Sequence, residues 1–239
     1  MGLSHSRNYR KRNYNKIIEN NLENPLSTDN NVSTRIPNEI KRCPDGIKRF
    51  PDRSLHDWSF HGYYEEVIWL IENGSNVNEM DQFGRTPLYL SVGYPKIAKA
   101  LLDNGCSLSS IDIHEKTPLI EACQRVTSEN IKFFKTIKLF ISNGSDVNAK
   151  DIYKNTSLYY ASNNEKIDIV NLLIQNGADV NTENILKETP LFNASSKGRI
   201  DTVNLLLQNG AERYHKNING KTAYEKIPKC FKEMMSVLK

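Results

Sequence analysis

Few side chains in this sequence have the types and spacing that catalysis or metal binding requires. His56 and His61 lie five positions apart, a poor spacing for one face of a helix, so they would make a weak pair of metal ligands. Glu65 and Glu66 are adjacent acids at a predicted helix start, where the helix dipole favours carboxylates without any catalytic role. The sequence contains no Gly-rich phosphate loop, H-E-x-x-H pair, G-x-S-x-G turn or set of kinase motifs. We therefore expect a protein that is not an enzyme and has no metal or cofactor.

The four cysteines do not form a recognisable site either. Cys43, Cys106, Cys123 and Cys230 include no C-x-x-C pair, and no histidine lies at ligand spacing from them. Reduced thiols of this kind are typical of proteins inside the cell. The N-terminus lacks the apolar run of a signal peptide, and no stretch of about 18 apolar residues occurs that would span a membrane. We expect an intracellular, cytoplasmic protein.

The charge is unevenly distributed along the chain. The sequence has 32 Lys and Arg residues against 28 Asp and Glu residues, which is a formal net charge of +4. Residues 1–50 hold ten of the basic residues but five of the acidic ones, which leaves 22 against 23 in the remainder. Nucleic acid binding requires clustered Lys and Arg side chains that neutralise phosphates. We therefore expect the neutral remainder not to bind nucleic acid.

One short pattern occurs five times. An Asn-Gly pair recurs with spacings of 31, 39, 33 and 33 residues, beginning at Asn73, Asn104, Asn143, Asn176 and Asn209. Seven residues after each glycine stands an acid or its amide, at Asp81, Asp112, Asp151, Asn184 and Asn217. Five residues further on stands a threonine, at Thr86, Thr117, Thr156, Thr189 and Thr222. The agreement of five frames predicts a repeat protein, in which stacked units bury apolar faces that one unit cannot bury alone.

Each unit has the signals of two short helices. The runs TPLIEA and TPLFNA place Thr where its hydroxyl can cap a helix, and Pro at the first helical position, where its missing N–H is harmless. The dense apolar run from Ile167 to Ile174 suits a helix buried between neighbours. Asn-Gly then ends that helix, because glycine adopts the left-handed conformation without steric cost. The sequence therefore predicts an all-α solenoid of helix-turn-helix units.

In these motifs the chain resembles ankyrin-repeat proteins, whose unit of about 33 residues combines a β-turn with two helices and carries a T-P-L-H-x-A signature. The matching residues are Thr86-Pro87-Leu88, Thr117-Pro118-Leu119 with Ala122, Thr156 with Leu158 and Ala161, and Thr189-Pro190-Leu191 with Ala194. The resemblance covers residues 49–239 and extends to families of large DNA viruses and intracellular bacteria, whose proteins meet host factors. It implies β-turn fingers, binding of a protein partner, no catalytic activity and, in such organisms, a place in the host cytoplasm.

We expect five to six units behind an N-terminal tail. The predicted boundaries are 1–44 for the tail, 45–80 for a first capping unit, then 81–111, 112–150, 151–183 and 184–216, and 217–239 for a partial C-terminal capping unit. Unit 81–111 is two residues short, so Gly93 and Pro95 are expected to make a tight turn between its helices. Unit 112–150 carries six extra residues near 125–134, which form either a protruding recognition element or an extension of both helices.

The chain departs from the family pattern at two kinds of position. The signature histidine survives only as His56 and is replaced by Tyr89, Ile120, Tyr159 and Phe192, so the hydrogen bonds that it makes in the family are expected to be mostly absent. The glycine of the turn tip remains at Gly84 and Gly220 but is replaced by Glu115, Lys154 and Lys187. A left-handed backbone at each of these three residues costs about 1 kcal/mol relative to glycine.

The resemblance places partner binding at the finger tips and on the first-helix face that lines the concave groove. The tip candidates are Phe83, His114, Ile152, Tyr153, Ile185 and Leu186, and the groove candidates are Leu90, Glu121, Tyr160 and Asn193. Exposed apolar and aromatic stripes usually mark partner sites. The alternative is that the tip isoleucines fold back on the adjacent turn. We expect a monomeric scaffold with one protein-binding surface.

The tail suggests a second function. Residues 1–44 are polar and Asn-rich and show no helical or strand period, so we expect disorder. Its start, MGLSHS, fits the N-myristoylation pattern at Gly2, and the basic residues Arg7, Arg10, Lys11, Arg12 and Lys16 follow. A lipid and a basic patch are the two signals that stable membrane attachment requires, so a membrane-tethered adaptor is the alternative to a free scaffold. An unmodified tail, a nuclear-type basic patch, and an array hydroxylated at Asn78, Asn148 or Asn181 also remain open.

Overall fold

The computed structural model of the chain describes residues 53–126, 131–164 and 166–228. The predictions for the tail, including Gly2, for residues 127–130 of the insertion and for the end of the last unit lie outside these residues. The described part forms α-helices and one 3-10 segment and contains no strand. The elements are α2 (Leu55–His61), α3 (Tyr64–Glu72), α4 (Pro87–Leu90), α5 (Pro95–Asp103), α6 (Pro118–Arg125), α7 (Ile131–Ser142), α8 (Ser157–Ala161), α9 (Ile167–Gln175), α10 (Pro190–Ser196), α11 (Ile200–Gln208) and η1 (Tyr224–Lys226).

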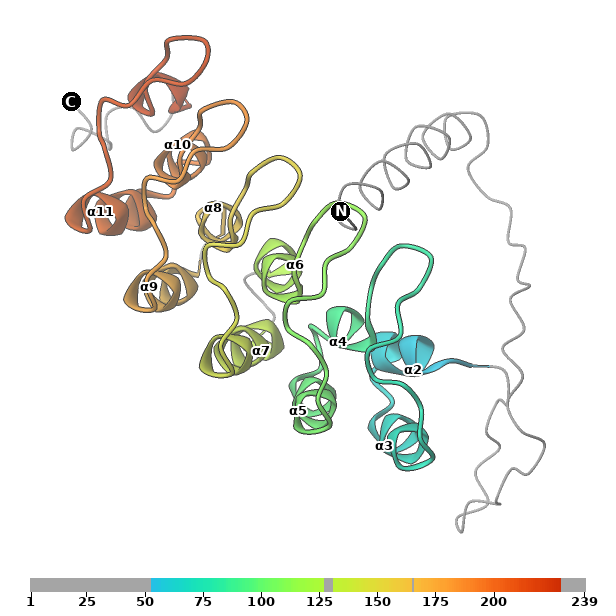
Figure 1. Ribbon diagram of the computed structural model, residues 1–239. Coiled ribbons are helices and arrows are strands. Elements are labelled where there is room, and N and C mark those ends of the chain that lie inside the picture. The colour runs from blue at the N-terminus through green and yellow to red at the C-terminus, as the bar shows by residue number, and fades with distance from the viewer. Residues whose placement is uncertain (1–52, 127–130, 165, 229–239) are drawn as a thin grey trace. The chain divides into compact units, whose positions relative to one another are not determined.

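The helices are arranged in two parallel rows. The first helices of the units, α2, α4, α6, α8 and α10, contact one another in sequence order, and so do the second helices α3, α5, α7, α9 and α11 (Figure 1). One hydrophobic core runs through all units, from Leu55 in α2 to Ile227 beyond η1. Each helix pair therefore buries its apolar face against the next pair, and the predicted all-α solenoid is confirmed.

The repeated threonines and Asn-Gly pairs determine where the helices begin and end. Thr86, Thr117 and Thr156 each accept a hydrogen bond from the backbone N–H three residues later, as a helix N-cap does. Thr189 has the same extended backbone but makes no such bond. The five glycines of the Asn-Gly pairs have φ between 81° and 87°, the left-handed conformation that was predicted.

The asparagine of each Asn-Gly pair has its own role. Its side-chain Nδ2 donates to the backbone carbonyl four residues earlier, over 2.7 Å at Asn73, 2.9 Å at Asn104 and 2.8 Å at Asn143, Asn176 and Asn209. The last carbonyls of a helix have no partner within the helix. The amide side chain provides one, and the glycine then reverses the chain.

The buried residues of the second helices differ in part from the expected run. In α9 the residues Ile169, Val170 and Leu173 are buried, whereas Leu172 packs against the core from a partly exposed position. Ile167, which was expected to be buried, is exposed. The same phase recurs in α11, where Leu206 is fully buried and Leu205 only partly. A continuous apolar run does not specify its buried face, because every rotation of the helix buries several of its members.

The two irregular units depart from the regular unit length in opposite directions, one shorter and one longer. The short unit has a first helix of four residues, α4, and a turn in which the N–H of Tyr94 donates to the carbonyl of Ser91 over 2.7 Å. The predicted tight turn near Gly93 and Pro95 is confirmed. In the long unit α7 has 12 residues, whereas α3, α5, α9 and α11 have nine each. Part of the insertion therefore extends a helix.

Three turn tips store backbone strain. Glu115, Lys154 and Lys187 have φ of 59°, 60° and 55°, in the left-handed region that was predicted. We expect Lys154→Gly to raise the free energy of unfolding by about 1 kcal/mol, because glycine adopts this conformation without a Cβ clash. Lys138→Gly, at an exposed position within α7, is the control and should lower it by about 1 kcal/mol. Urea denaturation measures both, and a lower stability of Lys154→Gly would contradict the strain.

Candidate functional site

Five turns connect the repeat units, and all are built in the same way. They span residues 81–85, 112–116, 151–155, 184–188 and 217–221, and we call them the fingers. In the first finger Oδ1 of Asp81 accepts from the N–H groups of Phe83 and Arg85, both over 2.9 Å. The side chains of Asp112, Asp151, Asn184 and Asn217 accept the same two bonds in their own fingers. Asp and Asn side chains are short and accept such local bonds more strongly than Ser or Thr hydroxyls do, which explains why Asp or Asn recurs there.

Main-chain hydrogen bonds connect each finger to the next. The N–H of Ile113 donates to the carbonyl of Phe83 over 2.9 Å, and the N–H of Ile152 donates to the carbonyl of His114 over 2.9 Å. The same bond runs from Ile185 to Tyr153 and from Ile218 to Leu186, over 3.0 Å each. The tips therefore form a continuous row, whose spacing is maintained by backbone atoms and not by the side chains.

The side chains of this row are largely apolar and point into solvent. Seven of them are between 38% and 55% exposed, namely Phe83, Ile113, Ile152, Tyr153, Ile185, Leu186 and Ile218. None of these isoleucines is buried against the adjacent turn. His114 is half-buried. Phe83 lies against the Arg85 guanidinium, 4.8 Å from its ring centroid, and Arg85 pairs with Asp81 over 2.7 Å. A row of exposed apolar side chains on a rigid main chain is suited to contact with another macromolecule.

The groove candidates are less available than the tips. Leu90 is buried, with 7% of its surface exposed, so its prediction as a contact residue needs correction. The other three are accessible in part but are engaged within the array: Glu121 accepts from Tyr89, Tyr160 donates to Asp151 over 2.5 Å, and Asn193 donates to the carbonyl of Tyr159 over 2.7 Å.

Two of the four residues that replace the signature histidine, Tyr89 and Tyr159, make hydrogen bonds of a different kind between units. The Tyr89 hydroxyl lies 2.8 Å from Oδ2 of Asp112 and 3.1 Å from Oε2 of Glu121, both in the next unit. The Tyr159 hydroxyl lies 3.4 Å from Oε2 of Glu188. His56, the retained histidine, is within hydrogen-bond distance of the carbonyls of Glu79 and Arg85, at 2.9 Å and 3.1 Å. The tyrosine hydroxyls therefore bond to carboxylates of the following unit, whereas the His56 ring lies at backbone carbonyls.

The environment of the Tyr89 hydroxyl predicts that the array is sensitive to alkaline pH. Burial, reinforced by the charges of Glu121 and Asp112, raises the pKa of Tyr89 far above its usual value near 10, and burial beside Glu188 raises the pKa of Tyr159 to about 12. Because the pKa is higher in the folded than in the unfolded chain, the protonated hydroxyl stabilises the fold. This stabilisation is fully present below pH 10 and is lost as pH rises.

We expect the free energy of unfolding to fall above pH 10, and to fall less steeply in Tyr89→Phe, by about 1 kcal/mol per pH unit. Urea denaturation at a series of pH values between neutral and strongly alkaline measures the two slopes. Tyr214→Phe, at an exposed tyrosine, is the matched control and should keep the wild-type slope. Equal slopes in wild type and Tyr89→Phe would contradict the buried hydroxyl.

Asparagines at the base of the units connect neighbours. Nδ2 of Asn78 donates to the carbonyl of Gly105 over 3.0 Å, and its Oδ1 accepts from the N–H of Ser107 over 2.8 Å. Asn148 and Asn181 bridge to the following unit in the same way. These bonds give the three asparagines a structural role, and their hydroxylation stays a prediction.

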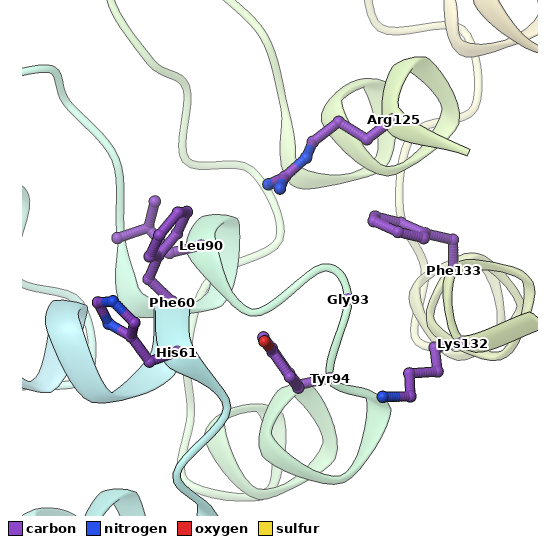
Figure 2. A pocket seen from close by; sticks show the side chains of 8 residues that line it. All are labelled: Phe60, His61, Leu90, Gly93, Tyr94, Arg125, Lys132 and Phe133. Atoms are coloured by element: carbon purple, nitrogen blue, oxygen red, sulfur yellow. The ribbon is translucent and has the colours of Figure 1, made fainter. Parts of the chain in front are cut away.

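Sequence reasoning missed a pocket at the junction of the first three units. It has a volume of about 450 Å³ and is lined by Phe60, His61, Leu90, Gly93, Tyr94, Arg125, Lys132 and Phe133 (Figure 2). A smaller hollow of about 270 Å³ adjoins it, since Phe60 and Leu90 line both. The sequence features that relate to this pocket are the short second unit and the long third unit. The sequence analysis did not predict that the two lengths together would leave a pocket at their junction.

The described residues contain no group of three or more His, Cys, Asp or Glu side chains that could hold a metal ion. Burial raises the pKa of the Cys106 thiol to about 11 and that of the Cys123 thiol to about 12, so both are protonated and unreactive at neutral pH. None of the helices in the described ranges is both long and apolar enough to cross a membrane.

Comparison with known proteins gives two matches. A family model described as ankyrin repeats, in three copies, matches residues 55–151 and 126–219. A Rickettsia felis protein named as an ankyrin repeat protein is 36% identical over 106 residues. That match covers 42% of this chain and 46% of the relative, so the chain spans about half the length of the protein that it resembles.

Proposed function

The chain belongs to the ankyrin-repeat family, and from this premise we propose that its finger tips and the adjoining groove hold one protein partner. Ankyrin repeats are protein-protein interaction modules and in general have no enzymatic activity, so the coarse role of the chain is that of an interaction scaffold. The observation that supports the tips is their exposed apolar row, which the packing of the array does not need. Phe83, Tyr153 and Leu186 are the proposed anchors, because large apolar side chains dominate binding energy at interfaces.

The tips are better suited than the groove to recognise the partner. The groove residues Glu121, Tyr160 and Asn193 are engaged in hydrogen bonds within the array, and a partner would have to replace those bonds. The tip side chains make few polar interactions, and their main chain is already fixed by the bonds between fingers. Little conformational freedom is therefore lost on binding, which favours affinity.

A photo-crosslinking amino acid at Tyr153 tests this proposal in the cell of origin. We expect benzoylphenylalanine at position 153 to form a discrete crosslinked product with one protein. The same residue at position 138, which is exposed on the second-helix row, should not form that product. Crosslinking of the same protein from position 138 alone would place the interface on the opposite row and refute the tip surface.

We further propose that the tail places the array at a membrane, as the alternative to a freely cytoplasmic scaffold. The pattern MGLSHS followed by five basic residues up to Lys16 favours it. A single acyl chain binds membranes only marginally, so the basic residues would supply the second contribution.

Co-expression with a eukaryotic N-myristoyl transferase tests the tail. We expect intact-mass spectrometry to find one myristoyl group on Gly2 after removal of Met1, and none in Gly2→Ala. Binding to vesicles that contain phosphatidylserine should increase on acylation and should decrease when the five basic residues are replaced by glutamine. An unmodified Gly2 in the wild-type chain would end the tether proposal and would leave the scaffold proposal unaffected.

A further inference from the structure

The pocket at the junction of the first three units arises from the unequal lengths of its neighbours. The four-residue helix α4 ends early, and the turn that holds Gly93 and Tyr94 is recessed between the end of α2 and the longer helices α6 and α7 (Figure 2). Each first helix begins at its finger, so this pocket lies at the far end of the first helices, away from the tips. It is therefore a second concave site.

The floor of the pocket is fixed by a close approach between two units. Gly62 ends α2 with φ of 84°, and a Cβ atom built there would lie 2.1 Å from a ring carbon of Tyr94. Only glycine permits this approach, so the Tyr94 ring is held against the end of α2. Phe133 lies close to Gly93 on the other side, and a Cβ atom there would meet its ring at 3.6 Å. Backbone packing therefore fixes the positions of the Tyr94 and Phe133 rings in the unliganded protein.

The walls combine aromatic rings with basic groups. The Lys132 ammonium lies 5.8 Å from the Tyr94 ring centroid, and the Arg125 guanidinium lies 5.8 Å from the Phe133 ring centroid. Among the described residues that line the pocket, none is acidic. The nearest described acid on the same helix is Glu121, which pairs with Arg125 over a long 3.7 Å and also accepts from Tyr89. The charged side chains in the described lining are therefore the two basic ones, Arg125 and Lys132.

We propose that this pocket binds an acidic peptide segment of the partner protein, with a carboxylate at Arg125 and Lys132 and a neighbouring apolar side chain between Phe60, Tyr94 and Phe133. This inference rests on the proposed scaffold function and names a second contact with its chemical class. Phe60 is 45% exposed and can take part in an interface without unfolding its helix. Basic groups beside aromatic rings match a segment that is both anionic and apolar.

The dimensions and charge of the site favour a peptide over a nucleic acid or a membrane. A cavity of about 450 Å³ accommodates one or two side chains, whereas nucleic acid binding requires a long row of phosphate contacts. A membrane surface would need a broad basic face, and residues 51–239 have 22 basic against 23 acidic residues. The smaller hollow that shares Phe60 and Leu90 leads from the pocket towards the finger at Asp81 and Arg85. Because Asp57 and Asp81 line this hollow opposite Arg85, we expect the acidic segment to end at the pocket.

Fluorescence anisotropy with the full chain tests the pocket. The probe is a short fluorescein-labelled peptide in which one Phe stands between two pairs of Glu. We expect saturable binding that becomes at least about tenfold weaker in the double variant Arg125→Gln and Lys132→Gln. The matched control Lys135→Gln and Lys138→Gln removes two exposed positive charges from α7 outside the pocket and should stay within about twofold of wild type.

The apolar half of the pocket is tested by Phe60→Ser and by the peptide itself. We expect Phe60→Ser to weaken binding about fivefold or more, and peptides with Gln for Glu or Ser for Phe to lose most of their affinity. The double variant of Arg125 and Lys132 should melt like wild type, since both side chains are exposed. The basic tail is present in every variant, so binding that is insensitive to the pocket variants would belong to the tail and would overturn the proposal.

Two further probes decide between ligand classes. Labelled oligouridylate and vesicles of phosphatidylserine and phosphatidylcholine should bind wild type and the Arg125 and Lys132 double variant equally. If either of them depends on these two residues while the peptide does not, the acidic peptide is the wrong occupant. The tip variant Phe83→Ser, Tyr153→Ser, Leu186→Ser should keep the peptide affinity of wild type. The experiments can therefore refute the pocket proposal and the tip proposal independently.

Discussion

Leu173→Ala is expected to lower the free energy of unfolding by about 2 to 5 kcal/mol. Leu173 is fully buried on α9, which contacts both α7 and α11, so the substitution leaves a cavity between three neighbouring units. The cost combines the lost transfer of the side chain from water with the cavity that rigid neighbours cannot fill. Because each unit is stabilised only by its neighbours, the weakened junction should also broaden the transition.

Urea denaturation followed by circular dichroism measures this loss, and Leu172→Ala provides the matched control. Leu172 is the same residue type, one position earlier on the same helix, but it packs against the core from a partly exposed position. We expect its loss to be less than half of that for Leu173→Ala. A larger loss for Leu172→Ala would mean that α9 presents a different face to the core.

The repeat and the residues that begin and end its helices could be predicted from the sequence because they depend on local chemistry. A threonine three residues before a free N–H caps a helix whatever lies elsewhere, as Thr86 does, and a glycine such as Gly177 ends one. The strained tip at Lys154 could also be predicted, since the turn geometry is the same in every unit. Five copies of one pattern made each of these local signals more certain than a single copy would.

Features that depend on contacts between units could not be predicted in the same way. The Tyr89 hydroxyl bonds to Asp112, 23 residues later, and its reach depends on the distance between two stacked units. Leu90 stands four residues after its cap Thr86, as Glu121 does after Thr117, yet Leu90 is buried, and the local pattern does not distinguish the two positions. The pocket around Tyr94 needs one short and one long unit side by side. Each irregularity was visible in the sequence, but their joint effect is three-dimensional.

The second large effect concerns the finger tips. Replacing Phe83, Tyr153 and Leu186 with serine is expected to weaken partner binding about a hundredfold or more, because large apolar anchors supply much of the energy of an interface. The fold should be preserved, since the bonds between fingers use the carbonyls of these residues, which serine retains. Exposed substitutions usually change stability by within about 0.5 kcal/mol each. The double variant Tyr64→Ser and Ile167→Ser removes exposed apolar side chains away from the tips and should bind normally.

The dissociation constant of the partner for the triple variant Phe83→Ser, Tyr153→Ser, Leu186→Ser is the most direct test of the tip surface. It should be measured by calorimetry on protein whose thermal melt has been recorded under the same conditions. We expect a rise of about two orders of magnitude together with a melting temperature close to that of wild type. An unchanged dissociation constant in the folded triple variant would show that the partner binds elsewhere on the array.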